Sequence, residues 1–181
     1  MISINIFAIS ALINGIVSTV FGLIVISKNW RDKTNQVFLL MMASLAVWSF
    51  SYWQWQLSND YATALLWVKI LSVGSLFVPI FFYNWIIRLL KIDNSVNKIL
   101  LWIVYTTSVT TLFFVNSNLF IANLERKSIF PFWPNSGPAY DTYFTYIYLG
   151  LTSYAIYLLL RHNTQISWLF LATFPQKTIV N

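Results

Sequence analysis

The sequence predicts an all-α fold, a polytopic bundle of transmembrane helices with five full spans and a partial sixth. Of the 181 residues, 58% are hydrophobic and only 9% are charged, whereas soluble domains carry about 25% charged residues. Residues 70–87, between Lys69 and Arg88, contain no charge and would measure about 27 Å as a helix, close to the hydrocarbon thickness of a bilayer. Similar apolar blocks separated by short polar loops fill the remainder of the chain. We therefore expect lipid to be the main solvent of this protein.

The predicted spans follow these apolar blocks, within a single domain covering residues 1–181. The sixth block is about 13 Å long as a helix, less than half a bilayer. We therefore expect the domain to be incomplete, as a truncated or mis-assembled piece of a longer protein. The full spans are predicted at residues 4–26, 37–57, 64–87, 99–115 and 142–160, and the partial span at 166–174.

The first block has no basic start and no small-residue cleavage site, so we interpret it as a span and not as a signal peptide. Gly15, Ser18 and Gly22 recur at spacings of three and four, which places small residues on one face of a helix. Such a face favours close packing against a neighbouring helix, with a dimer contact as the alternative.

Two features single out the second and third spans. Pro79 lies in the middle of the third and is a candidate helix kink, because proline removes a backbone hydrogen bond. Trp48, Tyr52 and Trp55 share one face of the second. An interfacial aromatic belt is the simpler interpretation of that face, and an aromatic-lined ligand pocket is the alternative.

Residues 116–141 form the one long loop. Its second half is rich in proline and aromatic residues, which preset the backbone and offer apolar surface. We expect an ordered cap lying on the bundle, with these candidate residues: Pro131, Trp133, Pro134, Gly137 and Pro138.

The cations indicate an orientation. Because positive charges collect in cytoplasmic loops, the loops after the first, third and fifth spans are predicted to be cytoplasmic and the N-terminus to lie outside. Lys69 is expected to reach the interface by snorkelling, with a functional intramembrane cation as the alternative. The topology determinants are Lys28, Arg31, Lys33, Arg88, Lys91, Lys98 and Arg161.

Few residues are suited to catalysis. The chain has five acidic residues, one histidine and no cysteine, and no two carboxylates share a helix face at a spacing suited to acid–base or metal chemistry. The glycines form no phosphate-binding loop. We therefore expect no enzyme within these residues, no catalytic residue, no cofactor or metal site, and no nucleic-acid partner.

Two local patterns resemble the N-terminal seven-helix region of bacterial sensor histidine kinases. The first is a tryptophan in the second span followed by W-x6-G-x4-P in the third, here Trp48, Trp67, Gly74 and Pro79. The second is the loop FPFWPNSGPAY before the fifth span. The resemblance covers roughly residues 5–174 and implies a seven-helix parent in the inner membrane, with a kinase or cyclase output domain.

This resemblance implies a non-catalytic input module of a two-component signal transduction system. Such a module responds to an unknown external or membrane-borne ligand, signals as a homodimer and relays the stimulus to a cytoplasmic domain absent from this chain. A small transporter or channel component, with a route lined by Asn14, Asn84 and the hydroxyls of the fourth span, is one alternative. A fragment without independent function is the other.

Overall fold

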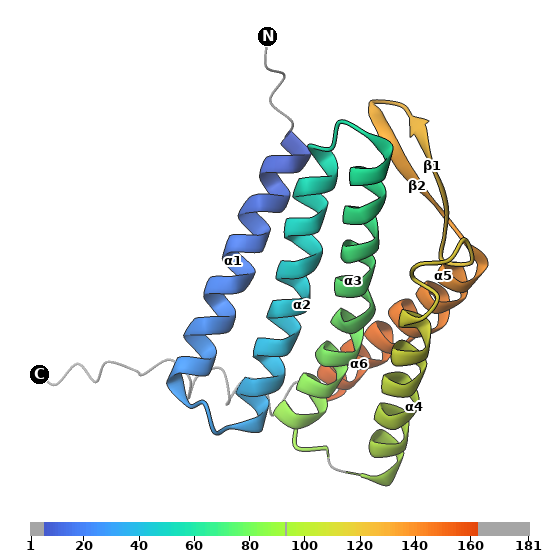
Figure 1. Ribbon diagram of the computed structural model, residues 1–181. Coiled ribbons are helices and arrows are strands. Elements are labelled where there is room, and N and C mark those ends of the chain that lie inside the picture. Colours follow the sequence, from blue (N-terminus) through green and yellow to red (C-terminus); the bar gives the residue numbers. More distant parts are fainter. Residues whose placement is uncertain (1–5, 93, 163–181) are drawn as a thin grey trace, which may run out of the picture.

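The computed structural model describes residues 6–92 and 94–162 and shows a helical bundle with a short hairpin at one end (Figure 1). Four helices come first: α1 (Ile6–Lys28), α2 (Lys33–Gln56), α3 (Tyr61–Leu89) and α4 (Ser95–Leu112). An antiparallel hairpin of β1 (Ile121–Lys127) and β2 (Phe130–Ser136) follows. The last region consists of α5 (Pro138–Tyr143), a π-helical segment η1 (Phe144–Leu149) and α6 (Gly150–Arg161).

Short polar side chains set the starts of three helices. Asp32, Asp60 and Asn94 are the N-caps of α2, α3 and α4, and each accepts a hydrogen bond from a backbone N–H of the first helical turn. Such caps satisfy amides that have no partner within the helix. The polar residues between the apolar blocks thus determine where the chain turns.

Helix α3 is the centre of the fold, since it contacts α2, α4, α6, η1 and both strands. Its approach to α2 is very close at Gly74, where an added Cβ would lie 2.7 Å from the backbone nitrogen of Trp48. On the other side of α2, Gly15, Ser18 and Gly22 of α1 are buried, and a Cβ on Gly22 would lie 3.0 Å from the Cβ of Met42. This confirms that the small face of the first span serves close helix packing.

Within residues 6–92 and 94–162, four helical segments are long and apolar enough to cross a membrane: α1, α2, α3 and the continuous segment Pro138–Arg161 that contains α5, η1 and α6. The sequence predicted five full spans, and that number is not confirmed. Helix α4 spans only 18 residues, and its polar first turn and hydroxyl-rich second half reduce its apolarity. The predicted partial span at 166–174 lies outside the described residues.

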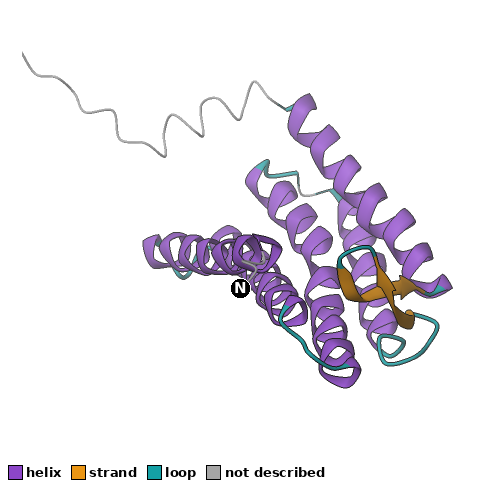
Figure 2. Cartoon of the chain, turned by 90° about the horizontal axis from the view of Figure 1, so that it is seen from above, coloured by secondary structure: helices purple, strands orange, loops and turns teal. Residues whose placement is uncertain are grey.

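The observed helices also extend beyond the predicted apolar cores. Helix α2 begins at Lys33, before the predicted start at 37, and α4 begins at Ser95, before the predicted start at 99. A polar first turn is expected where the end of a helix extends out of the hydrocarbon. A boundary drawn at the first apolar residue therefore underestimates the length of the helix. The fold is mostly helical, but the two-stranded sheet is an addition that the all-α expectation did not contain. Viewed from above, the strands lie at one side of the helices (Figure 2).

Two buried hydrophobic clusters stabilise the two ends of the bundle. One lies beneath the hairpin and includes Trp55, Phe120 and Tyr143. The other lies toward the end of α3 and includes Ile80, Tyr83 and Ala155. Many large apolar side chains outside these clusters remain exposed, among them Ile6, Ile13 and Phe21 on α1. Such an outer surface is expected for helices that face lipid.

Candidate functional site

The hairpin forms from residues 121–136, inside the loop where the sequence predicted an ordered cap. Its turn is short, because Lys127 pairs with Phe130, and Ser128 adopts a left-handed conformation with φ 55°. Both Pro131 and Pro134 lie in β2, where proline is tolerated because a two-stranded sheet leaves one edge of each strand unpaired. A hydrogen bond from the Asn135 side chain to Asn123 Oδ1, 2.7 Å long, joins the two strands.

Gly137 connects the hairpin to α5 at a point that admits no side chain. An added Cβ would lie 2.3 Å from the carbonyl oxygen of Leu119. The Gly137 backbone N–H donates to the carbonyl of Phe120 at 2.9 Å, and Pro138 then begins α5. Proline at the first helical position needs no hydrogen-bond partner, so this Gly-Pro pair turns the chain from strand to helix.

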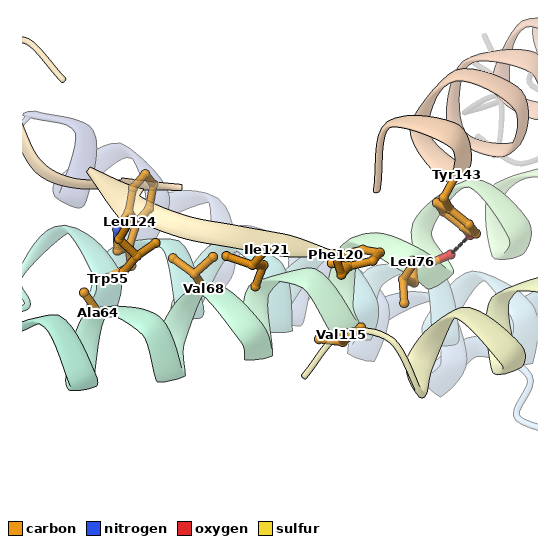
Figure 3. Close-up of a cluster of buried hydrophobic side chains, with 9 residues drawn as sticks. All are labelled: Trp55, Ala64, Val68, Leu76, Val115, Phe120, Ile121, Leu124 and Tyr143. Atoms are coloured by element: carbon orange, nitrogen blue, oxygen red, sulfur yellow. Dashed lines mark hydrogen bonds between the residues drawn. The ribbon is translucent and has the colours of Figure 1, made fainter. Parts of the chain in front are cut away.

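Strand β1 lies along the first half of α3 (Figure 3). Its buried residues Ile121 and Leu124 belong to the same cluster as Val68 and Ala64 of α3. A register shift between Ile121 and Asn123 places these two apolar side chains three residues apart on one face. The hairpin is therefore joined to the bundle by a continuous apolar contact.

Trp55 fixes the second strand to α2. Its indole Nε1 donates to the backbone carbonyl of Phe132 at 2.8 Å. Its ring lies 5.9 Å from that of Trp133 and 6.4 Å from that of Phe130, and Tyr52 meets it edge-on at 5.0 Å. The aromatic face predicted on the second span thus packs against the prolines and aromatics of the loop.

Two cavities adjoin each other at Phe120 and Tyr140, and we call them together the aromatic cavities. One of about 270 Å³ runs between α3 and β2 and is lined by Leu71, Ser72 and Trp133 among others. The other, of about 290 Å³, is lined by Trp48, Ser75 and several tyrosines of the last helical region. Phe120 and Tyr140 line both, with their rings edge to face at 5.3 Å.

The chemistry of these linings is apolar with a few hydroxyl groups. In the described part of the chain, no charged side chain lines either cavity. Small-molecule sites in proteins are commonly apolar and aromatic with a few placed polar groups. The arrangement is suited to an uncharged ligand and offers no acid–base or metal chemistry.

Tyr143, which lines the second cavity, links three elements of the bundle. Its hydroxyl donates to the backbone carbonyl of Leu76 in α3 at 2.5 Å and is bonded to Ser108 Oγ of α4 at 2.8 Å. Figure 3 shows the bond to Leu76. Pro79, buried inside α3, lies three residues beyond Leu76 and supplies no N–H to the helix. Tyr143 therefore bonds α3 within one turn of its proline.

The π-helical segment η1 follows Tyr143 directly. Such segments interrupt α-helices mostly as short bulges and occur often at functional sites. Tyr148 of this segment lines the second cavity with Tyr143 and Phe144. The irregular part of the last helical region and the proline-containing part of α3 thus meet at one cavity.

The predicted topology residues lie at the helix ends opposite the hairpin. Lys28 ends α1, Lys33 begins α2, Arg88 lies in the last turn of α3, and Lys98 lies near the start of α4. Arg31 and Lys91 are in the intervening loops, and Arg161 is the last residue of α6. A larger open cavity, of about 670 Å³, lies at this end between α2, α3 and α4.

Sequence reasoning identified Trp48, Trp55 and Trp133 but missed the contributions of Tyr143 and Phe120. Nothing local marks a tyrosine near the start of a helix as the partner of a carbonyl 67 positions earlier. The aromatic residues of SIFPFWPNS, residues 128–136, were a weak signal for a strand, and the two prolines in this segment argued against one.

Taken together, these observations define a helical membrane protein with an ordered hairpin and two adjoining aromatic cavities. The chain belongs to the family described as the N-terminal 7TM region of histidine kinase, whose model matches residues 8–175. The resemblance inferred from the sequence is thereby confirmed. The family is a membrane sensor region and not a catalytic domain. No curated protein and no solved structure matches this sequence.

Proposed function

We propose that this chain is the membrane input module of a sensor, which binds a ligand in the aromatic cavities and relays its presence to an output domain outside this chain. The observation that carries the proposal is the position of Tyr143. Its ring lines a cavity, while its hydroxyl bonds α3 beside Pro79. A ligand in that cavity would act directly on a contact between two helices.

The ligand that fits best is small, uncharged and largely apolar. The linings combine aromatic rings with the hydroxyls of Ser72 and Ser75, and those hydroxyls already donate to carbonyls within α3. A buried ligand charge would have no partner in such a lining and would be costly. An external or membrane-borne compound with an aromatic or aliphatic body meets these requirements.

The relay requires two arrangements of the bundle with different affinities for the ligand. Helix α3 is the candidate moving element, because Pro79 leaves one backbone carbonyl without its usual N–H partner. Segment η1 is the second candidate, since a π-helical turn can shift to an α-helical one with a change of register. Small shifts of packed helices are a common form of such transitions.

The proposed setting is the inner membrane of a bacterium, with several spans, the N-terminus and the hairpin outside, and a homodimer as the signalling unit. The cations at the opposite end support that orientation through the positive-inside rule. The dimer follows from the family alone. The relay then proceeds toward the end that carries Arg88 and Arg161.

The experiment compares two leucines of α3 in the full-length parent sensor, with the activity of its output domain as the measurement. Leu71 lines the first cavity, whereas Leu66 is 54% exposed on the same helix. Leu71→Trp should fill the cavity and abolish or lock the response, while Leu66→Trp should leave it unchanged. Equal responses in the two variants would contradict a ligand site in this cavity.

A second variant tests the moving element. Pro79→Ala restores the missing backbone donor of α3 and should shift the output at every stimulus level, because it changes the balance between the two helix arrangements. Output that is unchanged across the whole stimulus range would exclude the proline as part of the relay.

The transporter alternative has less support from the observed contacts. The Asn14 side chain donates to Ser49 Oγ between α1 and α2, and Asn84 donates to Tyr105 OH between α3 and α4. Ser108 is bonded to Tyr143. The polar groups that a transport route would use are thus employed separately in joining helices.

A further inference from the structure

The cavity opposite the hairpin differs from the aromatic cavities in size and charge. It measures about 670 Å³ and lies between the start of α2, the end of α3 and the start of α4. Among the described residues, the lining contains three cations, Arg88, Lys91 and Lys98, and one carboxylate, that of Asp32. That carboxylate accepts a hydrogen bond from the Thr34 backbone N–H at 2.7 Å as the cap of α2. The cavity is therefore basic on balance.

The Asn84 side chain fixes the orientation of Arg88 at this basic cavity. Asn84, buried, accepts from Arg88 Nε at 2.9 Å and donates to Tyr105 OH at 2.9 Å. Among the described residues, Nε carries the one hydrogen bond of the Arg88 side chain, which leaves both NηH2 groups as donors. A guanidinium oriented in this way is well suited to bind two oxygens of a phosphate.

Lys91 is held at the cavity by an uncommon backbone conformation. It has φ 55°, a left-handed conformation that normally favours glycine or asparagine at a helix end. The Ile92 N–H donates back to the Ile87 carbonyl at 2.9 Å, as expected for a helix terminated by such a residue. A lysine at this position costs folding stability, and residues in such conformations often mark functional sites.

An exposed apolar side chain of α4 lies near the basic cavity. Leu101, together with Ile87 and Ile92, lines the cavity, and the next residue of α4, Trp102, is 76% exposed. The cavity also lies at the end of α3, one of the helices able to cross a membrane, and hence at headgroup depth. A charged site beside exposed apolar surface matches a phosphate attached to acyl chains.

We propose that the basic cavity binds the headgroup phosphate of an anionic phospholipid, with the acyl chains lying against α4. Arg88 and Lys91 contact the phosphate oxygens. Basic pockets between membrane helices are a known mode of anionic-lipid recognition. The site is separate from the aromatic cavities and does not depend on the proposed sensing role.

The test uses the purified 181-residue chain in neutral detergent and follows its thermal unfolding by tryptophan fluorescence. Phosphatidylglycerol is titrated against phosphatidylcholine as the zwitterionic control, and glycerol phosphate is added at matched concentration as the soluble phosphate. Phosphatidylglycerol should raise the unfolding temperature in a saturable manner, and neither of the other two should do so. If glycerol phosphate raises the unfolding temperature by as much, the cavity binds a soluble anion and not a lipid, and the proposal is overturned.

The Lys91→Gly variant distinguishes a loss of phosphatidylglycerol binding from a loss of folding stability. Glycine favours φ 55°, so the variant should be at least as stable as the parent chain without lipid. Removing one cation should nevertheless weaken phosphatidylglycerol binding about fivefold, and adding Arg88→Gln should weaken it about 25-fold. Arg126→Gln, at an exposed cation of the hairpin, is the matched control and should change binding less than about twofold. Unchanged binding in Lys91→Gly with Arg88→Gln would overturn the proposal.

Discussion

Tyr143→Phe tests the contact on which the proposed function depends. The substitution removes one oxygen and keeps the ring, so the packing of this side chain, which is only 6% exposed, is preserved. Two hydrogen bonds disappear, one to the Leu76 carbonyl and one with Ser108. A hydrogen bond within a folded protein contributes about 1 kcal/mol net, and those between membrane helices average about 0.6 kcal/mol. The expected loss in the free energy of unfolding is therefore about 1–2 kcal/mol.

The assay is unfolding of the purified chain by titration with a denaturing detergent, followed by circular dichroism. Tyr146→Phe is the matched control, because Tyr146 lies one turn further along and is 74% exposed. That variant should unfold like the parent chain. Ser108→Ala completes a double-mutant cycle with Tyr143→Phe, and the two substitutions should be less than additive by about 0.5–1 kcal/mol, since they remove a shared bond.

Two results would refute this reasoning. If Tyr143→Phe unfolds at the same detergent fraction as the parent chain, the hydroxyl does not join the helices. If Tyr143→Phe and Ser108→Ala are fully additive, the two hydroxyls act independently, and the link between the last helical region and α4 is absent.

Three further predictions concern other contacts of the fold. Gly74→Ala should destabilise the chain by about 1–3 kcal/mol, because its Cβ would overlap the backbone of α2, whereas Gly150→Ala, with no atom closer than 4.0 Å, should be neutral or slightly stabilising in thermal unfolding. Trp55→Phe should release the hairpin, because it removes the 2.8 Å hydrogen bond from the indole to the Phe132 carbonyl, and it should speed tryptic cleavage between β1 and β2. The same change at Trp102, which is 76% exposed, should leave the cleavage rate unaltered. The cap of α3 makes stability sensitive to acid, since a backbone N–H lowers the pKa of the Asp60 carboxyl. A carboxyl whose pKa is lowered by folding stabilises the protein at pH values above its unfolded pKa, and this stability is lost as the pH falls through its folded pKa. The unfolding temperature should therefore drop below about pH 4, and it should drop less in Asp60→Asn. An equal drop in both proteins would count against the cap.

Local chemistry explains why several features were predictable from the sequence. Small residues at helical spacing identify a packing face whatever the partner is, and Gly15 and Gly22 do pack against α2. Polar residues between apolar blocks become helix caps, as Asp32 and Asp60 show. The family, too, could be inferred from residues within two spans and one loop.

The hairpin was not predictable in the same way. Prolines at 131 and 134 argue against a strand in isolation, and the contacts of β1 with α3 and of β2 with Trp55 of α2 make the conformation favourable. The candidate cap residues Pro131 and Trp133 therefore lie in a strand whose existence depends on packing.

What the sequence determined by itself was the solvent of this protein, the approximate course of its helices and the family to which it belongs, because hydropathy and helix caps are properties of neighbouring residues. What only the tertiary structure decided was the placement of the aromatic cavities, the basic cavity and the bond from Tyr143 to Leu76. Those features arise from contacts between segments as far as 67 positions apart, and the free energy of such contacts depends on how whole helices pack. The groups that meet at the Tyr143 hydroxyl come from α3 and α4, and only the folded bundle brings them together.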